Sequence, residues 1–151
     1  MKTFSNFLQE SFNTPYHWEW TTKKSDQRYA RFFDSNSHKF IVRILEIQSL
    51  SFVPENSWTL DFVYKKSEKS LPSWDNTNFG NPLAIFSTVI DITKSFIKLK
   101  KPAQIQFFAT EPNKAKLYVK LLKKFEAELK TLEYEIVNDT DYFTIQKRKN
   151  Q

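Results

Sequence analysis

Prolines and a single glycine divide the second half of this chain into a helix, a strand and a second helix. Gly80 is the only glycine in the sequence, and Pro82 follows two positions later. Proline is tolerated in the first turn of a helix, where its missing N–H has no partner to lose, and it ends a helix that runs into it. We therefore predict one helix between Pro82 and Pro102, a short strand after it, and a second helix that Pro112 opens. The buried stripe expected on the first helix consists of Leu83, Phe86, Val89, Ile90, Phe96 and Ile97.

The first half of the chain has the alternating pattern of β-strands. Trp18 and Trp20 alternate with polar residues, which is a period of two. Short polar turns follow, and such turns favour antiparallel neighbours. The strands expected over the whole chain are one from Tyr16 to the turn at Lys23, then Gln27–Asp34, Lys39–Gln48, Trp58–Lys66, Gln104–Ala109, Tyr134–Val137 and Tyr142–Gln146.

The order of these elements predicts the fold class. Four strands, a helix, a strand, a helix and two strands give the order ββββαβαββ, and each strand–helix–strand unit needs a right-handed crossover. We expect an α+β domain with a mixed, mostly antiparallel sheet of about seven strands and two main helices. The domain is expected at residues 15–147, after an amphipathic segment at 1–14 and before a basic tail at 148–151.

Composition excludes several kinds of site. The chain contains no cysteine, which rules out disulfides, thiolate zinc sites and cysteine nucleophiles. Its two histidines, His17 and His38, lack the spacing of metal ligands, so no metal is expected. No apolar run reaches the roughly 18 residues that a membrane-spanning helix needs, and no secretory leader is recognisable.

The net charge of +6 leaves two readings of the basic residues open. Lys116, Lys120 and Lys123 fall on one side of the second predicted helix. They could contact the phosphates of a nucleic acid. Lysines on a helix are more often a solvated surface, which the sequence favours here.

The first ten residues, MKTFSNFLQE, resemble the capsid-targeting peptides of internal head proteins of T-even-type phages. In that family a prohead protease cuts after a Leu-x-Glu sequence. The resemblance implies recognition of Leu8 and Glu10 and a cut before Ser11. It also implies a location in the phage head or the host cytoplasm, and a head or host protein as partner. The alternative is an ordinary amphipathic helix packed on the domain.

The segment from Trp58 to Gln146 resembles the C-terminal two-thirds of GNAT-type N-acetyltransferases. The strand, the loop at Gly80, the helix–strand–helix order, the pair Leu117-Tyr118 and the closing hairpin carry the resemblance. It implies an acetyl-CoA site in which Gly80, Asn81 and Leu83 lie beside the pyrophosphate. It also implies that Tyr118 is the acid that protonates the departing thiolate.

The sequence departs from that family in its coenzyme loop. Pro82 stands where the family has a second glycine, and proline has no N–H to offer a phosphate. Tyr118 lies on the apolar stripe of its helix, so a core role is the alternative to catalysis. We therefore expect a degenerate acetyltransferase-fold protein that acts by binding and needs no cofactor. The alternatives are an active N-acetyltransferase using acetyl-CoA and a basic, nucleic-acid-associated internal head protein.

Overall fold

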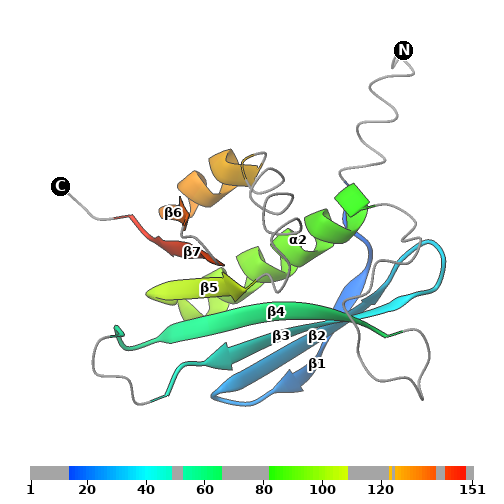
Figure 1. Cartoon of the computed structure of the whole chain (residues 1–151), viewed down its shortest axis with the longest axis horizontal. Coiled ribbons are helices and arrows are strands. Elements are labelled where there is room, and N and C mark those ends of the chain that lie inside the picture. The colour runs from blue at the N-terminus through cyan, green and yellow to red at the C-terminus, as the bar shows by residue number, and fades with distance from the viewer. Residues whose placement is uncertain are drawn as a thin grey trace, which may run out of the picture.

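The computed structural model describes residues 14–48, 53–65, 82–108, 123, 125–138 and 142–148 (Figure 1). They form one sheet with helices on one face. The strands are β1 (Trp18–Lys23), β2 (Gln27–Phe33), β3 (Lys39–Glu46), β4 (Ser57–Lys65), β5 (Gln104–Phe108), β6 (Tyr134–Asn138) and β7 (Tyr142–Lys147). Helix α2 (Pro82–Lys100) joins β4 to β5, and residues 125–131 are helical just before β6.

The predicted fold class is confirmed as an α+β sheet of seven strands with two helices. The strand order is β1-β2-β3-β4-β5-β7-β6, and every neighbouring pair is antiparallel except β4 and β5. Each predicted strand is present, with its ends moved by one or two residues, which is the usual uncertainty of strand limits. The predicted opening of the second helix at Pro112, the segment 1–13 and residues 149–151 lie outside the described residues.

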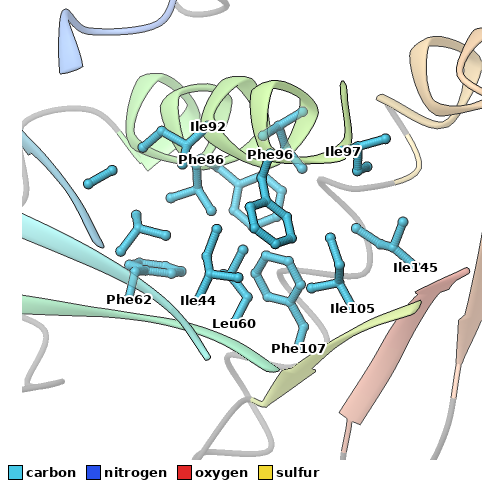
Figure 2. Close-up of a cluster of buried hydrophobic side chains, with 14 of the residues drawn as sticks. Ile44, Leu60, Phe62, Phe86, Ile92, Phe96, Ile97, Ile105, Phe107 and Ile145 are labelled. Carbon is cyan, nitrogen blue, oxygen red and sulfur yellow. The ribbon is translucent and has the colours of Figure 1, made fainter. Parts of the chain in front are cut away.

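The core lies between the sheet and α2. Alternate residues of β3, namely Phe40, Val42 and Ile44, are buried on the face that α2 covers. Figure 2 shows Phe96 of α2 above this layer, close to Phe107 of β5. The ring of Phe96 also meets the ring of Trp58 edge-on, with centroids 4.9 Å apart, an arrangement that aromatic pairs favour.

Helix α2 is buried more completely than its apolar stripe predicts. Every residue from 84 to 90 is buried, including Ser87 and Thr88. The chain leading into β1 covers part of the helix: the Tyr16 N–H donates to Thr88 Oγ1 at 2.8 Å, and the Trp18 indole N–H donates to Asp91 Oδ2 at 2.8 Å. Thr88 and Asp91, two polar positions of α2, therefore make tertiary contacts, while the last turn of the helix stays exposed at Lys98 and Leu99.

The C-terminal end of α2 is closed by a left-handed residue and by an asparagine from another loop. Lys101 has φ 46°, and its N–H donates to Ile97 O at 2.8 Å. The Asn56 Nδ2 amide donates to the carbonyls of Lys100 and Lys101 at 3.0 and 3.1 Å. The last carbonyls of a helix have no partner within it, so this side chain satisfies two of them.

The same asparagine holds the start of β4. Asn56 Oδ1 accepts the indole N–H of Trp58 at 2.7 Å, and its main-chain oxygen accepts the N–H of Ala103 at 2.8 Å. Asn56 itself has φ 63°, a region that asparagine tolerates better than most residues. The Asn56 side chain thus links the C-terminal end of α2 to Trp58, a fully buried residue at the start of β4.

We predict that Asn56→Gly lowers the free energy of unfolding by about 1–3 kcal/mol, because the Trp58 N–H loses its partner, while water replaces part of the two exposed bonds to the helix end. Glycine fits the left-handed backbone, so the native conformation of the loop is retained. Asn56→Asp keeps an acceptor for Trp58 but turns a carboxylate oxygen toward two carbonyls at the negative end of the helix, so it should lose at least as much as Asn56→Gly. Urea unfolding measures all three; a change below about 0.5 kcal/mol for Asn56→Gly would contradict this role.

The buried Tyr134 is expected to lower the stability of the fold at alkaline pH. Its side chain is buried, its hydroxyl donates to Pro102 O at 2.5 Å, and burial raises its pKa to about 12. The folded chain therefore holds this proton more tightly than the unfolded chain, whose tyrosine titrates near 10. Stability from this group is complete below pH 10 and is lost between about pH 10 and 12. The free energy of unfolding, measured with urea, should fall less steeply over that pH range for Tyr134→Phe than for the natural chain. Parallel plots of this free energy against pH for the two proteins would refute the assignment.

Candidate functional site at the end of the parallel strands

The one parallel pair of the described sheet marks the candidate site. β4 and β5 are paired from Ser57 with Gln104 to Leu60 with Phe107. The described part of β5 ends one residue later, at Phe108, and β4 runs on to Lys65. In open α/β sheets, ligands bind in the crevice outside the carboxyl ends of the parallel strands.

Other elements meet the carboxyl ends of these two strands. The end of β4 pairs with the start of β3, so the β2–β3 turn lies there. The end of β5 pairs with the start of β7 through Phe108 and Tyr142. Helix α2 ends beside Asn56, near the amino ends of β4 and β5, so its N-terminus points back toward their carboxyl ends. A helix N-terminus carries partial positive charge, which favours an anionic group.

Of the predicted coenzyme-loop residues, the structure describes only Leu83, whose backbone lies in the first turn of α2. Pro82 is the first residue of α2, as predicted, so this position has no N–H to donate. The remaining predicted site residues lie outside the described residues and stay predictions: Gly80, Asn81, Tyr118, Leu8, Glu10, Ser11, Lys116 and Lys120.

Lys123 is the one described residue of the predicted nucleic-acid face. It is helical and exposed, and no ion pair joins it to another described residue. A solvated lysine and a phosphate-binding lysine look the same in this respect, so both readings of the basic face stay open.

An aspartate–histidine pair in the β2–β3 turn was missed by the sequence analysis. The Asp34 carboxylate is fully buried, and it accepts the main-chain N–H groups of Asn36 and His38 at 3.0 and 2.7 Å. Its second oxygen lies 2.9 Å from Nδ1 of His38. A carboxylate acceptor requires the proton on Nδ1, so this contact sets the orientation and tautomer of the ring. An aspartate that opens a polar turn was the available signal, because such residues bond to the backbone ahead of them.

A second carboxylate, Asp61, lies on the face of the sheet away from α2. It accepts two hydrogen bonds from Arg43 of β3, at 2.8 and 2.7 Å. This hydrogen bond is the main reason that the pKa of Arg43 is raised above its ordinary value. Both oxygens of Asp61 are therefore already hydrogen-bonded to Arg43 across the two strands.

Two further kinds of feature are absent from the described ranges. Among these residues no three His, Asp or Glu side chains are gathered as a metal site would require. Within the same ranges, no helix is both long and apolar enough to cross a membrane.

The described residues define an α+β protein with an open seven-stranded sheet and one parallel strand pair. Residues 13–150 match the model of a family of unknown function (DUF6934), and the chain belongs to this family. Neither the curated proteins nor the solved structures contain a match to the chain.

Proposed function

We propose that this chain is a phage-encoded binding protein built on a degenerate GNAT-type acetyltransferase fold. The observation that carries the proposal is the parallel β4–β5 pair, whose two strands α2 joins in the chain, in an otherwise antiparallel sheet of the described residues. GNAT-type proteins part the corresponding strands to admit the acyl-coenzyme A. Here the same edge offers a site for a ligand or a protein segment.

A backbone detail supports the same ancestry. The run Leu132-Glu133-Tyr134 falls where GNAT-type sequences usually have Leu-Gly-Phe or Leu-Gly-Tyr. Glu133 has φ 66°, in the left-handed region that glycine adopts without cost. It follows the helical residues 125–131, and its N–H donates to Lys130 O at 3.0 Å, as in a helix C-cap. Glu133 therefore has the backbone conformation that a glycine at this position would adopt without cost.

The residues near the start of α2 and along β4 give little support to acetyl transfer as in GNAT-type proteins. Pro82 removes a main-chain donor from the start of α2, where the coenzyme pyrophosphate would lie. Asp61, a carboxylate in the middle of β4, is hydrogen-bonded to Arg43 on the face away from α2. We therefore propose action by binding, with acetyl transfer lost. Partners of the proposed protein are a component of the phage head or a host protein.

We predict that millimolar acetyl-CoA leaves the melting temperature unchanged, because the pyrophosphate cradle is incomplete. A ligand at 100 times its Kd adds about 2.7 kcal/mol, which is about 5–10 °C for a domain of this size. Thermal unfolding with and without acetyl-CoA measures this, and AMP at equal ionic strength controls for anion binding to a basic protein. A shift of that size with acetyl-CoA alone would favour an active N-acetyltransferase over the binding protein.

We predict that the chain recovered from purified phage particles begins at Ser11. Removal of residues 1–10 spares Tyr16 and Trp18, whose bonds to α2 fasten the start of the described fold. Intact-mass measurement of the particle-borne protein gives the mature terminus, and Glu10→Ala is the matched variant in which the cut should fail. A different terminus, or absence from the particles, would overturn the packaging proposal.

A further inference from the structure

The two edge strands of the sheet differ in how far they are protected against further pairing. β1 and β6 lie at opposite ends of the strand order (Figure 1). The pairing of β1 is shifted between Trp20 and Thr22, so this strand carries a bulge. β1 also has charged side chains at Glu19 and Lys23, and bulges and charges are the devices by which proteins block edge pairing.

β6 is less protected, because it has no bulge and only one of its five residues is charged. Its register with β7 is unbroken from Tyr134 to Asn138. The strand, YEIVN, has no proline and no lysine, and its single charge is Glu135. Val137 is 42 % exposed, and Ile136 is only partly buried. A regular, partly apolar edge of this kind is suited to adding another strand.

The outward backbone groups of β6 can be assigned from the ladder. The N–H of Arg148 donates to Glu133 O at 2.8 Å, which fixes the alternation of an antiparallel pair. Residues 133, 135 and 137 therefore bond toward β7. The N–H and C=O groups of Tyr134, Ile136 and Asn138 face the outer edge, where no other described strand pairs with them.

We propose that β6 pairs antiparallel with β6 of a second copy of this chain, so that the two sheets become continuous. A two-fold axis at Ile136 places this residue opposite itself, with Tyr134 opposite Asn138 of the second copy. This register uses all five residues of the strand. Glu135 then lies opposite Val137 of the second copy, on the face away from α2, and the exposed valine gains a neighbour.

Charge selects this register over its neighbour. Moving the axis to Glu135 would set two glutamates directly opposite each other, and like charges in that position are destabilising. Moving it to Val137 would leave only residues 136–138 paired. The register centred on Ile136 avoids both costs, so β6 is complementary to itself: all five residues pair with those of a second copy without a like-charge contact.

The test is a pair of charge variants at Val137, read by sedimentation over a wide concentration range at low salt. Val137→Glu places a glutamate opposite Glu135 of the second copy, twice by symmetry. The dimer should weaken by about 2- to 30-fold in Kd. Val137→Lys places a lysine opposite the same glutamate, and the dimer should be as tight as the natural one or tighter. Equal unfolding midpoints below the dimer Kd control for folding, because residue 137 is exposed.

A double variant closes the test. Glu135→Lys combined with Val137→Glu restores an opposite pair, so its dimer should recover the affinity that Val137→Glu alone loses. The proposal is overturned if the natural chain stays monomeric at every concentration. It is equally overturned if Val137→Glu and Val137→Lys change the dimer alike, or if neither changes it, because the interface would then lie elsewhere.

Discussion

The sheet depends on the way in which the end of α2 is fastened to the start of β4. A parallel neighbour cannot be made by a tight turn, so β5 reaches β4 only through the whole length of the helix. Asn56 fixes the geometry of that crossover, since it satisfies two carbonyls at the helix end and the indole of Trp58 at once. With the helix end held there, Phe96 meets Trp58, and β5 starts in register with β4.

This anchoring also determines where a site can form. The parallel strands are joined at their amino ends, near Asn56, by the bonds of that residue to the end of α2 and to Ala103. The turn that holds Asp34 and His38 lies at their carboxyl ends, with the N-terminus of α2. A fold that is anchored at one end of its strands can keep its core while the residues at the other end, and the chemistry they offer, change.

Local signals in the sequence predicted most of the architecture and little of the site. Pro82 bounds α2 and the two-residue period gives the strands, because these features act within a few residues of each other. The burial of every residue from 84 to 90 in α2 was not predicted, since this part of the helix contacts Tyr16 and Trp18, which are distant in sequence. Likewise, the residues around Asn56 give no sign that it caps a helix more than 40 residues away. The left-handed backbone conformation of Glu133 was not predicted either, because glutamate rarely adopts it.

The bulge in β1 has a consequence for how far such a protein can assemble. A sheet that is regular at both edges can add copies without limit, and the product is a fibre. Here the pairing of β1 slips between Trp20 and Thr22, so the repeat of backbone groups that a further strand would need is broken at that side. In the proposed dimer the β6 strands of the two molecules are paired with each other, so neither is open to a further copy. Assembly then stops at two copies, which keeps an aromatic-rich, strand-rich chain from polymerising.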